Sequence, residues 1–163
     1  SDLSVTRNTL LNQPVANLGP SPKGRTDILH EYFVPPAGLA DFLASAGDII
    51  RRSRQNLLNL TIRHVRDDRS SLLSYAKGER LGAVMLFSQE RTNLAETNMR
   101  EMTRDLIDAA ISAKGSFYLP YRLHATRKQV AAAYPDAAAF LSMKNRYDPR
   151  SLLRSAMWDA YFS

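Results

Sequence analysis

The feature of this sequence that most constrains its fold is the order in which strand-like and helix-like runs follow one another. Four runs have the alternation or the β-branched and aromatic content of strands, and they cover residues 27–34, 56–65, 81–89 and 115–126. Two runs, residues 37–54 and 93–114, repeat apolar side chains at helical spacing. The resulting order is βαββαβ, which predicts a ferredoxin-like α+β fold: an antiparallel sheet with helices on one face.

Capping signals mark the ends of several elements. Thr92 is placed to cap the helix over residues 93–114, and the segment "TRKQ" at residues 126–129 has the spacing of a capping box. Asp67 and Asp68 are the residue type that starts a helix, so a short helix is expected over residues 69–77. The same two carboxylates could be considered an acid/base pair, but adjacent acidic residues before a helix usually act as a cap.

Composition and the positions of proline and glycine divide the chain into three parts. Residues 1–27 are rich in proline and glycine and predict an irregular entry arm. Residues 28–134 contain the βαββαβ pattern, and residues 135–163 predict a helical tail. A chain of 163 residues is long enough to bury one ordinary core. Because it begins with Ser1 and not Met, we interpret it as a piece of a longer protein.

The composition excludes several kinds of site. The chain has no cysteine, which rules out disulfides, thiolate metal sites and a cysteine nucleophile and fits a cytoplasmic protein. Its three histidines, His30, His64 and His124, fall on different predicted strands without ligand spacing, so no metal site is expected. No glycine-rich phosphate loop is present, and no apolar run approaches the roughly 20 residues of a transmembrane segment.

The net charge of +6 suits an anionic partner, but it does not identify one. The run "LGAVMLFSQ" lacks the basic, aromatic pattern of an RNA-binding strand, so no specific binding of nucleic acid is expected. This run is apolar on both sides, with Met85 and Phe87 opposite Val84 and Leu86. Both faces of the sheet should therefore be shielded from water. The helices shield one face, and the C-terminal tail or another domain could shield the other.

A set of polar side chains is predicted on the face of the sheet that lies opposite the helices, called here the open face. In residues 56–65 and 115–126 the apolar side chains alternate toward the helices, although Pro120 could introduce a bulge. The polar side chains left on the open face are Asn59, Thr61, Arg63, Tyr118, Arg122 and His124. They are either bonded to a covering loop or form a donor array for sugar hydroxyls, a carboxylate or a developing oxyanion.

Four segments carry a resemblance to known proteins: "LHEYFVP", "NLTIRHV", "GSFYLPYRLHAT" and "AAYPDAAAFLSMKNRYDPRSLL". Together they resemble the C-terminal half of FAD-linked oxidoreductases of the vanillyl-alcohol oxidase class. The most similar branch contains sugar-lactone oxidases, alditol oxidase and decaprenylphosphoryl-ribose oxidase. The resemblance spans residues 27–162, and its most specific part is the "K-x-R-Y-D-P" pattern that begins at Lys144.

The resemblance implies that residues 28–134 are a cap, or substrate, domain of such an oxidoreductase. The cofactor would be FAD, held by an N-terminal domain of the same protein and not by this chain alone. The substrate would be a small molecule of the sugar, polyol or lactone type, oxidised at a C–H bond that bears a hydroxyl. The tail over residues 135–163 would dock on the flavin domain. The alternative is a free-standing ferredoxin-like module that binds a small anion or a protein partner.

The resemblance also implies roles for individual residues. Arg63 matches the arginine of a Glu-x-Arg pair in the family's cap strand, where this chain has Thr61 in place of the glutamate. Arg63 would stabilise a developing alkoxide, and His124 would act beside it at the catalytic centre. The residues expected to bind substrate are Asn59, Thr61, Tyr118 and Arg122. The residues expected to lie near the cofactor are Lys144, Tyr147 and Asp148.

Overall fold

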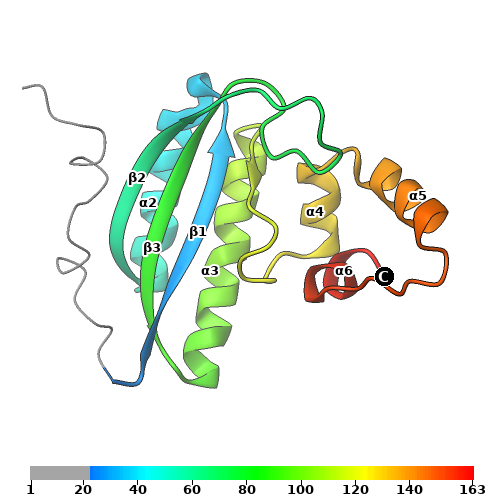
Figure 1. Cartoon of the computed structure of the whole chain (residues 1–163). Helices are drawn as coiled ribbons and strands as arrows, with labels where there is room; N and C mark the ends of the chain where they lie inside the picture. Colours follow the sequence, from blue (N-terminus) through cyan, green and yellow to red (C-terminus); the bar gives the residue numbers. More distant parts are fainter. Residues whose placement is uncertain (1–22) are drawn as a thin grey trace, which may run out of the picture.

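The computed structural model describes residues 23–163, and these form an α+β fold around one antiparallel sheet (Figure 1). The strands are β1 (Arg25–Val34), β2 (Asn56–Val65), β3 (Arg80–Glu90) and β4 (Ser116–Phe117), arranged in the order β2-β3-β1-β4. This order places each crossover helix on the sheet as the split βαβ pattern requires. The predicted ferredoxin-like fold class is confirmed.

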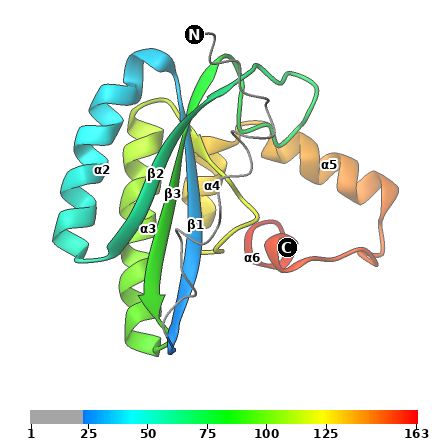
Figure 2. The same ribbon diagram turned by 60° about the vertical axis from the view of Figure 1, so that its left-hand side comes forward.

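Two long helices cover one face of the sheet. They are α2 (Leu39–Ser53), which follows a short 3-10 turn at Pro36–Gly38, and α3 (Asn93–Ser112); both lie on the same face of the sheet (Figures 1 and 2). Shorter helices follow: α4 (Arg127–Ala133), α5 (Ala137–Tyr147) and α6 (Ala156–Tyr161). Within residues 23–163 no helix is both long and apolar enough to cross a membrane.

The core lies between the sheet and the two long helices. Ile28, Tyr32 and Val34 of β1 contribute to it, as do Ala83, Met85 and Phe87 of β3. At the end of α3 the backbone comes very close to β1. A Cβ atom on Gly115 would lie 2.5 Å from the Phe33 carbonyl oxygen and 2.7 Å from Val34 Cγ1, so only glycine fits there.

The C-terminal helices differ in how they pack. Trp158 and Tyr161 of α6, with the adjacent Phe162, belong to the same core cluster as Val130 and Tyr134. Helix α5 has no buried residue. Its partly buried Ala137, Phe140 and Leu141 nevertheless pack against that cluster, although α5 lies away from the sheet (Figure 1).

Several predicted boundaries hold and others do not. The Thr92 cap forms, with its hydroxyl accepting from the Ala95 amide at 3.1 Å, and the capping box of Thr126 and Gln129 is complete. Strand β1 begins at Arg25, inside the predicted arm; the rest of that arm, residues 1–22, lies outside the described residues.

The helix expected over residues 69–77 is wrong, since residues 66–79 form an irregular loop. Asp68 accepts hydrogen bonds from the amides of Ser70 and Ser71 at 2.9 and 3.2 Å, which closes a local turn. Asp67 accepts from the Gly78 amide at 2.6 Å and so ties the two ends of the loop together. The two carboxylates therefore fold the loop back on itself, a role that competes with helix initiation.

The fourth strand is much shorter than the predicted span of residues 115–126. Only Phe117 and Ser116 pair with β1, opposite Tyr32 and Phe33. One further bond, from the Tyr118 amide to the Glu31 carbonyl at 3.0 Å, follows before the chain turns away. Pro120 cannot donate to a sheet ladder, and the turn that contains it directs the following residues toward α3.

Candidate functional site

The polar side chains of β2 lie on the open face, as predicted. Thr61 pairs with Val84 and Arg63 pairs with Gly82, whereas Ile62 between them pairs with Ala83 of the core. Paired residues of antiparallel strands point to the same side of the sheet. Asn59, Thr61 and Arg63 therefore point away from the helices, and all three are exposed.

The open face is apolar at its centre. Val84 lies there and is 8% exposed, whereas Leu29 beside it is 41% exposed. The loop over residues 66–79 covers only one end, where the ring of Tyr75 stacks on Phe33 at a centroid distance of 4.3 Å. The α5 and α6 helices lie beside the sheet and not over it (Figures 1 and 2).

Two tyrosines border the open face at the edge of β1. The rings of Tyr118 and Tyr121 meet edge to face at 4.6 Å, and the Tyr121 hydroxyl donates to the Glu31 carboxylate at 3.1 Å. Partial burial and the Glu31 carboxylate raise the pKa of Tyr121, against a smaller opposing effect of the charge on Arg63. The phenol is therefore protonated at neutral pH and acts as a donor.

Glu31 and Tyr121 were missed as candidate site residues. Glu31 alternates with the core residues His30 and Tyr32 in β1, so its place on the open face could have been inferred from period-two alternation. Its pairing with Tyr121 could not, because Tyr121 lies beyond the end of β4.

His124 is not on the open face, and this prediction is wrong. The side chain is buried on the helix side of the sheet, with Nε2 at 2.8 Å from a carboxylate oxygen of Glu96 and Nδ1 at 3.0 Å from the Thr103 hydroxyl. Glu96 and Thr103 are both residues of α3. The alternation used for the prediction stops at Tyr118 because the chain leaves the sheet there.

Arg122 also turns toward α3 and not toward Arg63. One of its terminal nitrogens lies 3.3 and 3.4 Å from the two carboxylate oxygens of Glu96. The structure thus divides the predicted site into exposed residues of the open face and a second group behind the edge of the sheet. We call this second group, made of Gln89, Glu96, Thr103, Arg122 and His124, the buried polar cluster.

The protonation states of the buried polar cluster follow from its geometry. Burial raises the pKa of Glu96, but hydrogen bonds from Gln89 and His124 and the charge of Arg122 outweigh this effect and leave the pKa below its usual value. Burial lowers the pKa of His124 despite the neighbouring carboxylate. At neutral pH an ionised Glu96 therefore accepts from His124 Nε2–H. His124 Nδ1 lies 3.0 Å from the Thr103 hydroxyl, which itself donates to the Met99 carbonyl at 2.6 Å.

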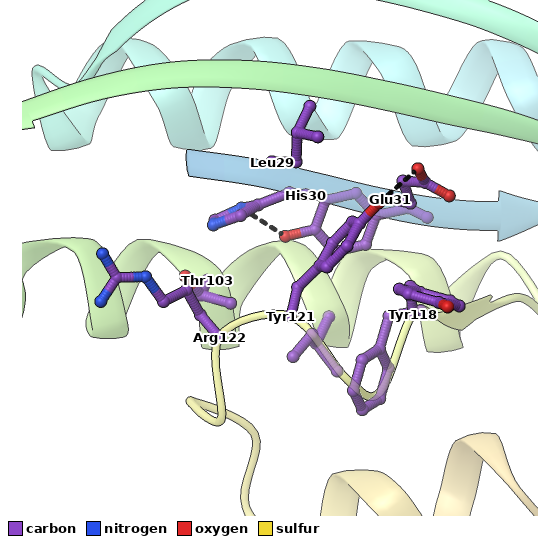
Figure 3. Close-up of a pocket in the computed structure, with 10 residues that line it drawn as sticks. Leu29, His30, Glu31, Thr103, Tyr118, Tyr121 and Arg122 are labelled. Carbon is purple, nitrogen blue, oxygen red and sulfur yellow. Dashed lines mark hydrogen bonds between the residues drawn. The ribbon is translucent and has the colours of Figure 1, made fainter. Parts of the chain in front are cut away.

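A cleft lies along the edge of β1 between the open face and the buried polar cluster (Figure 3). Its volume is about 20 Å³, and we call it the edge cleft. Leu29, Glu31, Tyr118 and Tyr121 line its outer part. The residues that line its inner part are His30, Tyr32, Thr103, Ile107, Phe117 and Arg122. The edge cleft therefore joins Tyr118 and Arg122, two predicted substrate-binding residues, to side chains that were not predicted.

The residues expected near a cofactor are mostly engaged within the chain. Lys144 forms an ion pair with Asp148 and lies 5.0 Å from the centroid of the Trp158 ring. Asp148 also accepts from the amides of Leu152 and Leu153 at 2.8 and 2.9 Å, and these contacts hold its pKa at about 2. Tyr147 is 72% exposed, and the guanidinium carbon of Arg146 lies 5.6 Å from the centroid of its ring.

Comparison of the sequence with models of known protein families finds no match, and comparison with curated proteins finds none either. In the described part of the chain, no group of three or more histidine, aspartate or glutamate side chains is arranged to hold a metal ion.

Proposed function

We propose that this chain is the substrate-binding cap domain of an FAD-dependent oxidoreductase that oxidises a C–H bond bearing a hydroxyl group. The observation that carries the proposal is the open face, on which the exposed polar groups of β2 lie beside partly exposed apolar residues. Arg63 makes no ion pair within residues 23–163, and Leu29 is 41% exposed. Such a surface is typical of a site completed by a second domain.

The residues on the open face suit the ring end of a flavin better than its phosphates. An apolar sheet surface can cover a flat ring, whereas a pyrophosphate requires backbone amides or free cations. Lys144 and Asp148 are bound to each other, so they offer no cradle for phosphate. We therefore place the nucleotide part of FAD on a separate domain and only the ring beside the open face. When bound, FAD would supply the acceptor for the electron pair of the C–H bond.

Arg63 has the electrostatic role in this proposal. As the hydroxyl proton is removed, the substrate oxygen gains negative charge. That charge is consumed when the C–H hydrogen leaves with its electron pair and a C=O bond forms. A guanidinium group cannot accept a proton at working pH, but its fixed fork of N–H donors stabilises such an oxygen. Arg63 is exposed on the open face, where no partner from residues 23–163 competes for it.

Glu31 is the residue that would accept the hydroxyl proton. Its carboxylate lies on the open face and accepts a hydrogen bond of 3.1 Å from Tyr121, which orients it. Transfer of the hydroxyl proton to this carboxylate balances the departure of the electron pair from carbon. Thr61 and Tyr118 would hydrogen-bond the substrate. His124, which is bound to Glu96 and Thr103, would take no direct part.

The proposal is tested first on the protein in its native source. Antibodies raised against this chain would isolate the native protein for intact mass and visible absorbance. We expect a mass larger than that of 163 residues and the spectrum of an oxidised flavin. A flavin-free protein of this length would overturn the proposal and favour the ferredoxin-like module that binds a small anion or a protein partner.

The second test concerns Arg63 in that flavoprotein. Arg63→Ala should slow reduction of the flavin by substrate about 10²- to 10³-fold, with a smaller effect on substrate binding, because the donor acts mainly in the transition state. Arg63→Lys should restore only part of the rate, since a point charge does not reproduce the fork. Rapid-mixing spectroscopy measures both variants. Reduction at the wild-type rate in Arg63→Ala would show that the site lies elsewhere.

A further inference from the structure

A second cavity lies at one end of the sheet, between the loop over residues 66–79, the end of α3 and the end of α4. Figures 1 and 2 show these segments meeting there. Its volume is about 220 Å³. Three basic residues from separate segments line it, namely Lys77, Arg80 and Lys114, and among the described residues that line it none is acidic. We call this cavity the basic cleft.

The positive charges of the basic cleft are only partly balanced by the chain itself. Lys77 forms an ion pair with Asp136, which stands at the start of α5. Arg80 and Lys114 form no ion pair within residues 23–163. Like charges that line one cavity repel each other, and an anion between them relieves the repulsion. Two positive charges are therefore available to a ligand in this cavity.

The Arg80 side chain is partly buried and held beside the cavity. One terminal nitrogen donates to the Glu79 carbonyl at 3.0 Å, and its other nitrogens make no hydrogen bond within residues 23–163. Burial lowers the pKa of the guanidinium, and the charge of Asp67 opposes this effect only in part. The Asp67 carboxylate is paired with Arg69 instead. Because arginine stays protonated, Arg80 carries a charge that burial disfavours and that a bound anion would stabilise.

Lys114 adopts a backbone conformation that lysine rarely takes. Its φ angle is 58°, in the left-handed region, at the position after α3 where glycine or asparagine is usual. Its amide donates to the Ile111 carbonyl at 2.9 Å, and the Gly115 amide donates to the Ala110 carbonyl at 2.7 Å. The main chain alone therefore closes the end of the helix, and glycine would adopt this turn with less strain. A ligand that requires the ammonium group accounts for lysine at this position.

The size and the other walls of the basic cleft limit what the ligand can be. Ile111 and Pro135 give it an apolar side. The Ser116 hydroxyl donates to the Tyr75 carbonyl at 2.6 Å, which ties the loop to β4 beside the cavity. A volume of about 220 Å³ is below the roughly 300 to 1,000 Å³ of pockets for drug-sized ligands. The cavity therefore suits a charged group with a few carbon atoms and not a nucleotide.

We propose that the basic cleft binds the phosphate group of a small phosphate monoester between Arg80 and Lys114. A phosphate dianion matches the two unpaired charges, and its oxygens accept from a guanidinium and an ammonium group at the same time. A carboxylate carries one charge and would balance only one of them. The carbon atoms of the ester lie against Ile111 and Pro135. The site is separate from the place proposed for FAD, because it is too small for a dinucleotide.

Isothermal titration calorimetry on the full chain tests this inference, in a phosphate-free buffer at about pH 7.5, where a phosphate monoester is a dianion. The probes are glycerol 3-phosphate and inorganic phosphate, and the matched controls are glycerol and glycerate. We expect saturable binding of both phosphates, tighter for the ester, no binding of glycerol, and binding of glycerate weaker by about tenfold or more.

Three outcomes of this titration would overturn the proposal. The first is the absence of saturable binding of both phosphates. The second is equal affinity for glycerate and glycerol 3-phosphate, which would indicate a general attraction of anions by a basic surface. The third is tighter binding of adenosine monophosphate than of glycerol 3-phosphate, which would contradict the small size of the ligand.

Variants identify the residues responsible. Arg80→Gln and Lys114→Gln should each weaken binding of glycerol 3-phosphate about tenfold or more, which is the loss expected for a charge-assisted hydrogen bond. The matched control is Lys128→Gln, which removes an equal charge from an exposed position of α4 outside the lining of the cavity. It should change the affinity by less than about twofold. Equal weakening by all three variants would show that only net charge matters and would contradict a specific site.

Lys114→Gly separates binding from a structural role. Glycine adopts a φ of 58° without strain, so this variant should keep or raise the melting temperature while it loses affinity as Lys114→Gln does. If the charge of Lys114 served only to stabilise the helix end, Lys114→Gly would lower the melting temperature and leave the affinity unchanged, which would overturn its place in the site. All these measurements are made without flavin, so their failure and that of the oxidoreductase proposal are distinguishable.

Discussion

On the helix side of the sheet the side chains of the buried polar cluster bond to one another, whereas on the open face the polar side chains of β2 are exposed and mostly uncommitted. His124 has a partner at each ring nitrogen, and Glu96 is contacted by three side chains. Asn59 and Thr61, by contrast, share one hydrogen bond of 3.4 Å, and Arg63 has no ion pair within residues 23–163.

This difference separates polar residues that stabilise the fold from polar residues that are available to bind a ligand, which the sequence pattern alone does not distinguish. Buried groups that satisfy one another contribute to stability, and removing one leaves its partners without hydrogen bonds in a place that water reaches poorly. Exposed groups on a sheet contribute little to stability and remain available to a ligand. Stability and binding should therefore respond to different substitutions, which the following predictions examine in order of expected effect.

The largest effect is expected for His124→Ala, which removes a buried ring and both of its hydrogen bonds. The lost packing and the unpaired Thr103 and Glu96 groups should lower the free energy of unfolding by about 3 kcal/mol. Urea unfolding at neutral pH, monitored by circular dichroism, measures this. A loss below about 0.5 kcal/mol, the size usual for surface sites, would contradict the assignment of the buried polar cluster to stability.

A smaller effect is expected from acidification. The pKa of His30 is about 3 in the folded chain, below its value in the unfolded chain, so the unfolded state binds the proton first as the pH falls. Stability is then fully present above the unfolded pKa and decreases below it, by about 2 kcal/mol between about pH 7 and about pH 5. The lowered pKa of His124 adds to the loss in the same direction.

Unfolding curves measured across this range would test the assignment. The His30→Gln variant should show a flatter pH dependence, because it lacks the group that takes up the proton on unfolding. A pH dependence as steep as that of the wild type would mean that His30 is accessible to protons in the folded chain.

The smallest effect on stability is expected for Arg63→Ala on the open face. Arg63 is exposed and has no ion pair within the described residues, so its removal should change the free energy of unfolding by less than about 0.5 kcal/mol. Asn59→Ala is the matched control from the same strand and face. A loss of several kcal/mol for Arg63→Ala alone would make it a structural residue and would remove the comparison between the two faces.

The fold class could be predicted because it depends on local patterns. Alternation in residues 56–65, the continuous apolar run in residues 81–89 and helical spacing in residues 93–114 are properties of neighbouring residues, and each was sufficient to define an element. The Thr92 cap and the capping box at Thr126 are equally local and were also correct. The position of Asn59, Thr61 and Arg63 on the open face followed from the two-residue alternation of side chains in a strand.

Tertiary structure decided what lies beyond the end of a regular element. Alternation predicted His124 and Arg122 on the open face, but it holds only while the chain stays in the sheet, and β4 ends at Phe117. Where a chain leaves a sheet, the positions of its side chains depend on contacts with distant elements, here with Glu96 and Thr103 of α3. The pairing of Tyr121 with Glu31, 90 residues apart, has the same origin. The amino-acid sequence by itself therefore determined the sheet and its two faces, and only long-range packing determined which polar groups meet at the edge cleft.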